Sequence, residues 1–223
     1  MIGYLLRHGR TAYSASYRVN GDPNIAVPLD DEGLLACRAT RELFPVKIIT
    51  MWVTSSFLRA QQTGKLLQDG TGGPTCIEPL LDELDCGRFE GSPFLDYARW
   101  LHEHGPCSRP AEARESKHEG IQSMLTGVRA TLTLPGPLRV VAHGLLLSVL
   151  RWNSSNPSGT AMPLFFPEAP CLEPFAAADT DLREWIEDLI ADLGTQNGHN
   201  VSPADDTVEL RAGADPFLLP AIH

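Results

Sequence analysis

Two histidines stand directly behind short apolar runs that predict buried strands, and each histidine is followed by glycine. The first is His8, which follows Ile2–Leu6 and Arg7. The second is His143, which follows Leu138–Ala142. An imidazole can act as a nucleophile or carry a proton near neutral pH, and a guanidinium matches the oxygens of an anionic group. These residues are therefore the first candidates for a site that acts on an anionic ligand.

The segments around these histidines alternate between predicted strands and predicted helices. Branched apolar runs predict strands, and apolar residues at helical spacing predict helices. The predicted strands cover residues 2–6, 46–53, 75–78 and 138–142, and the predicted helices cover residues 30–44, 57–68, 94–104, 116–134, 145–152 and 179–193. This order predicts a three-layer α/β/α sandwich with a mainly parallel sheet. Ligands bind at the carboxyl ends of such strands, where both histidines fall.

The chain of 223 residues fits one domain with an appended tail. We assign residues 1–193 to the domain and predict a small cap at about residues 85–115. Residues 153–178 are rich in Pro, Ser and Ala and predict a long loop. Residues 194–223 are polar and aperiodic, which predicts a flexible C-terminal tail.

Composition excludes several classes of protein. The formal net charge of -10 argues against a binder of nucleic acid or of an anionic membrane, since both need a basic surface. It leaves a small anionic substrate open, because a few arginines in one cleft outweigh a diffuse acidic surface. The 5 cysteines form no CxxC pair, so neither a zinc site nor a disulfide framework is expected. With no signal-peptide pattern and no apolar run of membrane-spanning length, we expect a cytoplasmic protein.

Four segments, in order along residues 2–150, resemble the signature of the histidine phosphatase superfamily, which includes phosphoglycerate mutases and many phosphatases. The segments are Leu6–Thr11, Ser55–Thr63, Leu81–Gly91 and Val140–Gly144. A shorter segment, Arg114–Ser116, also resembles part of the pattern. One such motif is weak evidence, but four in order at compatible spacing are specific. The resemblance implies a phosphoglycerate mutase-like fold.

The resemblance also implies roles for individual residues in phosphoryl transfer. His8 is the implied nucleophile, which forms a phosphohistidine. Arg7 and Arg59 are the implied phosphate ligands, because their planar forks match phosphate oxygens. His143, when protonated, adds a further charged donor.

The acid-bearing segment of the superfamily matches Glu83. This residue would protonate the leaving oxygen and then take a proton from the hydrolytic water. Asp82 and Asp85 lie beside it and stay open as alternatives. The resemblance implies neither a metal ion nor another cofactor, and no group of histidines and acids in the sequence has metal-ligand spacing.

Near the first motif the sequence departs from the superfamily pattern. Many members carry Asn three residues after the position of Thr11, where it touches the phosphate, but this chain carries Ser14, whose reach is shorter. Asn20 and Gly21 occupy the place of a substrate-contacting pair. We therefore treat all four residues as candidate ligands of the phosphate ester.

These observations predict a metal-independent phosphatase that hydrolyses a small phosphorylated metabolite. The short segment 90–110 and the apolar Leu145–Leu147 favour hydrolysis over mutase action. A phosphoglycerate-type mutase, a repurposed enzyme and a silent member that binds a phosphorylated ligand remain the alternatives. Leu164–Phe166 would suit a pocket wall or a homodimer contact equally well.

Overall fold

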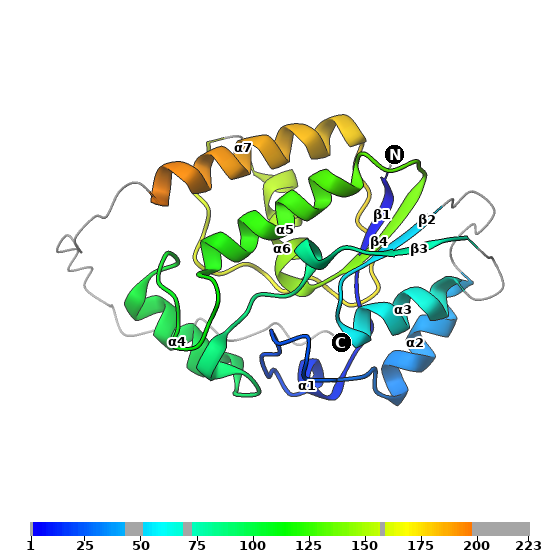
Figure 1. The fold of residues 1–223 in the computed structure, drawn as a ribbon, viewed down its shortest axis with the longest axis horizontal. Coiled ribbons are helices and arrows are strands. Elements are labelled where there is room, and N and C mark those ends of the chain that lie inside the picture. Colours follow the sequence, from blue (N-terminus) through cyan, green and yellow to red (C-terminus); the bar gives the residue numbers. More distant parts are fainter. Residues whose placement is uncertain (1, 43–50, 69–72, 157–158, 198–223) are drawn as a thin grey trace, which may run out of the picture.

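A four-stranded parallel sheet forms the centre of the computed structural model, which describes residues 2–42, 51–68, 73–156 and 159–197 (Figure 1). Its strands are β1 (Ile2–Arg7), β2 (Met51–Thr54), β3 (Thr75–Ile77) and β4 (Leu138–Ala142). Their order in space is β1-β4-β2-β3. The strand pairings are parallel, so the predicted mainly parallel sheet is confirmed.

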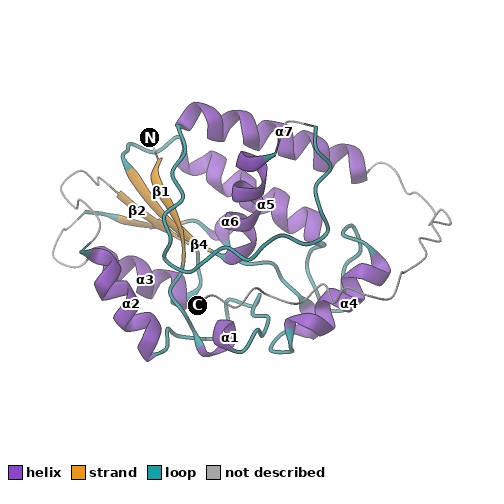
Figure 2. Ribbon diagram, turned by 180° about the vertical axis from the view of Figure 1, so that it is seen from behind, coloured by secondary structure: helices purple, strands orange, loops and turns teal. Residues whose placement is uncertain are grey.

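Helices cover both faces of the sheet, which confirms the predicted three-layer sandwich (Figures 1 and 2). One face carries α5 (Lys117–Thr131), α6 (Gly144–Ser155) and α7 (Asp179–Asn197). The other face carries α2 (Asp31–Arg41) and α3 (Leu58–Gln68). None of the helices within the described ranges is both long and apolar enough to cross a membrane.

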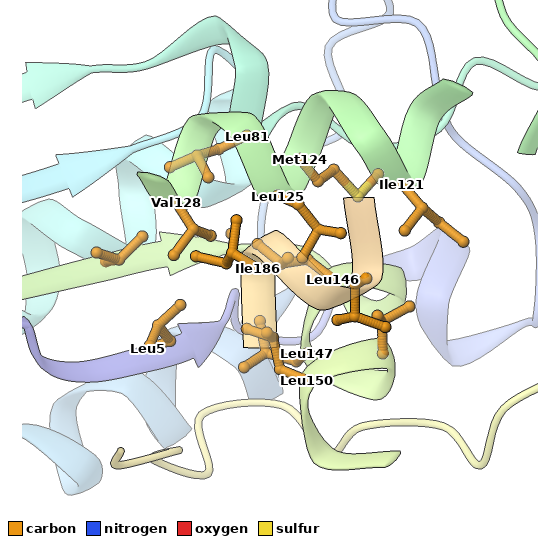
Figure 3. Packing of buried hydrophobic residues seen from close by; sticks show 14 of the residues in the cluster. Leu5, Leu81, Ile121, Met124, Leu125, Val128, Leu146, Leu147, Leu150 and Ile186 are labelled. Atoms are coloured by element: carbon orange, nitrogen blue, oxygen red, sulfur yellow. The ribbon is translucent and has the colours of Figure 1, made fainter. Parts of the chain in front are cut away.

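Alternation along the strands divides the core into two layers. Leu5 packs into a cluster with residues of α5, α6 and α7, whereas Leu6 packs with residues of α2 and α3. Figure 3 shows residues of the first cluster, among them Leu125 of α5 and Ile186 of α7. Successive strand side chains point to opposite faces, and burying one large apolar side chain contributes roughly 1.5–3 kcal/mol. The two layers therefore fix the sheet and the residues at its ends.

The remaining elements lie around the carboxyl ends of the strands or lead into them. They are α1 (Ala12–Ala15), α4 (Phe94–His104) and two 3-10 helices, η2 (Pro79–Leu81) and η3 (Gly87–Phe89). The predicted cap, residues 85–115, contains η3 and α4. Tyr97 and Leu101 of α4 are buried against the larger core cluster, so this segment is attached to the domain by apolar packing.

The structure differs from the sequence-based expectation in residues 153–178. Helix α6 continues to Ser155, and the segment then pairs with the edge of β1. Leu5 and Phe175 exchange backbone hydrogen bonds of 2.9 and 2.8 Å, and the amide of Leu172 donates to the Arg7 carbonyl at 3.1 Å. These bonds satisfy the edge of β1, which would otherwise expose unpaired backbone groups.

At the C-terminal side, α7 continues to Asn197, so residues 194–197 are helical and do not begin the predicted tail. The rest of that tail, residues 198–223, lies outside the described residues, as do residues 46–50 of a predicted strand.

Candidate active site

Three neighbouring strands deliver the polar residues of the site. His8 follows β1, His143 follows β4, and Ser55 follows β2. Strand β4 pairs with both β1 and β2 in parallel, so all three residues emerge at one edge of the sheet. The ring centroids of the two histidines lie 5.2 Å apart. The pattern of two strands that each end in a histidine thus produces one shared site.

His8 is buried and held in one tautomer by its two neighbours. Its Nδ1 lies 2.7 Å from the Gly9 carbonyl oxygen, and Arg59 donates from Nε to His8 Nε2 at 3.0 Å. Because a guanidinium only donates, Nε2 accepts and the proton resides on Nδ1. Burial, with the charges of Arg59 and Arg7, holds the pKa of His8 well below its usual range. His8 is therefore a neutral imidazole with its Nε2 lone pair toward Arg59.

Arg59 connects the two histidines. Its NH2 lies 3.2 Å from His143 Nδ1 and donates to the Asn20 carbonyl oxygen at 3.0 Å, while NH1 donates to the Asn20 side-chain oxygen. Burial lowers the pKa of Arg59 to about 10, and Glu83 is the largest charge that opposes this shift. The guanidinium therefore stays charged at neutral pH.

His143 is also neutral in this arrangement. Since Arg59 donates to Nδ1, the ring proton resides on Nε2, which lies 2.7 Å from the hydroxyl oxygen of Ser55. Burial and the nearby Arg59 hold the pKa of His143 well below its usual range. Phe57 packs edge-on against the ring at 4.7 Å between centroids. A phosphate dianion beside Nδ1 would favour the protonated form of His143. In that form the ring would be the charged donor that the sequence predicts.

Arg7 binds the carboxylate of Glu168, which no pattern in the sequence singles out. Its NH1 donates to Glu168 at 2.5 Å and to the Ala169 carbonyl oxygen at 2.7 Å. Burial alone would lower the pKa of Arg7, but the neighbouring side chains of Cys171 and Glu168 raise it. Arg7 Nε is buried and, within the described chain, has no hydrogen-bond partner.

The three candidate acids have different partners. Asp82 accepts from the Ser56 amide at 2.7 Å, and burial raises its pKa. Asp85 accepts from Arg114 at 2.7 Å; burial opposes ionisation, but the bond to Arg114 gives this carboxyl a lowered pKa. Glu83 is half-buried, accepts from the Leu84 amide at 3.1 Å, and acts on both Arg59 and Arg7 through its charge.

Asn20 and Gly21 are held in place by Glu90. This carboxylate accepts from the Asn20 side-chain amide at 2.8 Å and from the backbone amides of Gly21 and Asp22 at 2.7 and 3.1 Å. A Cβ at Gly21 would lie 1.9 Å from the Leu84 carbonyl oxygen, so only glycine fits there. Asn20 thus reaches the site as a partner of Arg59. Glu90 was missed as a site residue, although it lies within the Leu81–Gly91 motif.

Thr11 and Ser14 form a capping box at the start of α1. The Ser14 amide donates to Thr11 Oγ1 at 3.1 Å, and the Thr11 amide donates to Ser14 Oγ at 2.9 Å. Both hydroxyls thus bind backbone groups of the same turn. Their expected contact with a phosphate stays a prediction. Among the described residues, no three histidine, cysteine or acidic side chains group as metal ligands.

Residues 3–165 match the model of the histidine phosphatase superfamily, branch 1. The chain therefore belongs to this superfamily, and the resemblance in its motifs is confirmed. Among curated proteins, it is 31% identical over 157 residues to a "Probable phosphoglycerate mutase GpmB" of Cronobacter sakazakii, covering 66% of this chain and 71% of that protein. A protein of the same description from Yersinia pestis is 29% identical over 156 residues, with the same coverage of 66% and 71%.

Solved structures with the same fold include enzymes described as phosphatases. A putative alpha-ribazole-5'-P phosphatase from Escherichia coli superposes with a TM-score of 0.59 at 23% identity, covering 72% of this chain and 80% of that chain. A mycobacterial glucosyl-3-phosphoglycerate phosphatase superposes with a TM-score of 0.56 at 23% identity, covering 69% of this chain and 79% of that chain. At these identities the likeness establishes the shared fold.

The two buried histidines predict how stability depends on pH. Their pKa values are lowered in the folded protein, so they contribute stability that is present above the unfolded value of about 6.5 and lost as pH falls below it. We expect the free energy of unfolding to fall by up to about 2.7 kcal/mol per pH unit below pH 6.5 on their account. Urea unfolding between pH 5 and 8 measures this slope. The double variant His8→Gln, His143→Gln should flatten it, and an unchanged slope would contradict the assignment.

Proposed function

We propose that this protein is a metal-independent phosphatase that hydrolyses small phosphomonoesters through a phosphohistidine on His8. The observation that carries the proposal is the state of His8, a neutral imidazole whose Nε2 lone pair lies against the Arg59 guanidinium. A nucleophile needs that lone pair, and a transferring phosphoryl group needs that cation. A phosphate placed on Arg59 would therefore lie beside the attacking nitrogen.

In the first step His8 Nε2 forms a bond to phosphorus while the ester P–O bond breaks. Glu83 gives its proton to the departing oxygen, which leaves as the neutral alcohol. Arg59 and Arg7 stabilise the charge on the three equatorial oxygens. The buried Nε of Arg7, which has no partner among the described residues, supports this role, because it is a donor left for a ligand.

In the second step a water molecule attacks phosphorus and the bond between phosphorus and Nε2 breaks. The electron pair of that bond returns to His8, and the Glu83 carboxylate takes the water proton. Inorganic phosphate leaves, and both residues return to their starting states. Nδ1 keeps its proton and donates to the Gly9 carbonyl throughout, so the nucleophile is regenerated in the same tautomer.

His143 adds a donor when phosphate is bound. Its Nε2–H donates to the Ser55 hydroxyl oxygen, and its Nδ1 faces Arg59. The negative charge of a phosphate would raise the pKa of His143, so that Nδ1 takes a proton and donates to a phosphate oxygen. Ser55 sets the ring orientation for this contact.

Mutase action is the second candidate, because the curated relatives above are described as probable phosphoglycerate mutases. One sequence argument against it does not hold: Leu146 and Leu147 are buried in the core, so their apolar character serves packing and does not distinguish the two activities. The fold neighbours described as phosphatases support hydrolysis. The two candidates share the phosphohistidine and differ in whether water or a second substrate oxygen accepts the phosphate.

Phosphate release from a panel of phosphomonoesters, with EDTA present, tests the main proposal. We expect turnover in the wild-type protein and none in His8→Ala, because the nucleophile is lost. His102→Ala is the matched control, since His102 is an exposed histidine of α4 and should leave turnover unchanged. Bisphosphate-dependent conversion of 3-phosphoglycerate without phosphate release would favour the mutase. No reaction by the folded protein would overturn both activities.

A second experiment identifies the general acid. Glu83→Gln removes the proton but keeps the side-chain shape, and we expect kcat to fall by about 10²–10⁴-fold. Asp82→Asn preserves an acceptor for the Ser56 amide and should lower kcat far less. Steady-state kinetics with an alkyl phosphate compares them. A larger loss in Asp82→Asn would transfer the role to Asp82.

A further inference from the structure

Glu168 lies at the proposed phosphate site although it falls outside the matched residues 3–165. Its carboxylate accepts from Arg7 NH1 at 2.5 Å, and its side chain is 57% exposed. A phosphate bound by Arg7 would thus lie on the same guanidinium as a carboxylate that also reaches solvent. The rest of an ester bound there would then lie near the Glu168 carboxylate.

The backbone around Glu168 is anchored, so the exposed carboxylate is held close to Arg7. The Ala169 amide donates to Ser148 Oγ of α6 at 3.0 Å, and the Ala169 carbonyl accepts from Arg7 at 2.7 Å. Upstream, Lys117 Nζ donates to the Leu164 carbonyl and lies 5.0 Å from the ring centre of Phe166. The segment is therefore fixed to two helices and to β1 on either side of the carboxylate.

The charges near Arg7 are unfavourable for a second anion. The charges of Glu168 and Glu83 raise the pKa of Arg7, and the charge of Glu90 raises the pKa of Arg59. A phosphate dianion is matched by the two arginines, but a further negative group on the leaving alcohol would meet these carboxylates. Like charges across a partly exposed site repel, and salt weakens that repulsion.

We propose that Glu168 is a specificity-determining residue that selects phosphomonoesters with a neutral, hydroxyl-bearing or cationic leaving group and rejects those with a carboxylate or a second phosphate. The proposal rests on the phosphatase function above. It assigns polyol and sugar phosphates, which can donate hydrogen bonds to the carboxylate, as the preferred chemical class.

Two esters of nearly equal shape test this selection. Glycerol 3-phosphate and 3-phosphoglycerate carry the same phosphate and differ in a hydroxymethyl group against a carboxylate. We expect the wild-type protein to prefer glycerol 3-phosphate in kcat/KM, and Glu168→Gln to reduce that preference by about five- to tenfold at low salt. The reduction should shrink as ionic strength rises.

Glu173→Gln is the matched control. Glu173 lies in the same segment, its side chain is 52% exposed, and its carboxylate pairs with Arg151 at 2.8 Å. Its replacement removes the same charge from the chain and should leave the preference unchanged.

The outcomes separate the two roles that Glu168 can have. If it only held Arg7 in place, Glu168→Gln would change both esters by the same factor, because both present the same phosphate, and the unchanged ratio would overturn the proposal. Hydrolysis with an unchanged ratio leaves the phosphatase function standing. If the wild-type protein released phosphate from neither ester and from no member of the wider panel, the phosphatase function would be overturned, and this selection with it.

Discussion

The hydrogen bonds from the buried Arg59 guanidinium to the two imidazoles determine the state of the whole site. A guanidinium has no acceptor, so each histidine nitrogen that faces it must carry a lone pair. His8 is thereby fixed with its proton on Nδ1, which donates to the Gly9 carbonyl, and His143 with its proton on Nε2, which donates to the Ser55 hydroxyl. The same positive charge also disfavours protonation of both rings. In the proposed phosphatase, one side chain thus supplies the cation for phosphate and keeps the nucleophile neutral.

The fold explains why Arg59 stays in this position. Helix α3 carries it, and Thr63 of the same helix accepts from the Gly9 amide at 3.0 Å while donating to the Arg59 carbonyl at 2.7 Å. The turn after β1 and the helix after β2 are therefore tied together directly. Asn20, which donates to Glu90, also accepts a hydrogen bond from the Arg59 guanidinium. Apolar packing on both faces of the sheet stabilises the strands from which these contacts start.

Local sequence patterns predicted the site residues that directly follow strands. They did not predict contacts between residues that are distant along the chain. His8 and His143 each follow a strand with a clear apolar run, so a parallel sheet alone places both at the same edge. Glu90 binds Asn20 across 70 positions, and Glu168 binds Arg7 across 161 positions. Hydrophobic periodicity carries no information about such distant contacts. Pairing of residues 171–175 with the edge of β1 was missed for the same reason, since isolated bridges leave no repeating pattern.

The most direct test of the central claim is to trap the phosphoenzyme during turnover of a radiolabelled phosphomonoester. After quenching in alkali and digestion, we predict label on the peptide that contains His8, stable to base and lost in acid, and no label elsewhere on the chain. Turnover with no label on His8, or with label on another residue such as Ser55, would contradict a phosphohistidine formed at the nitrogen that faces Arg59.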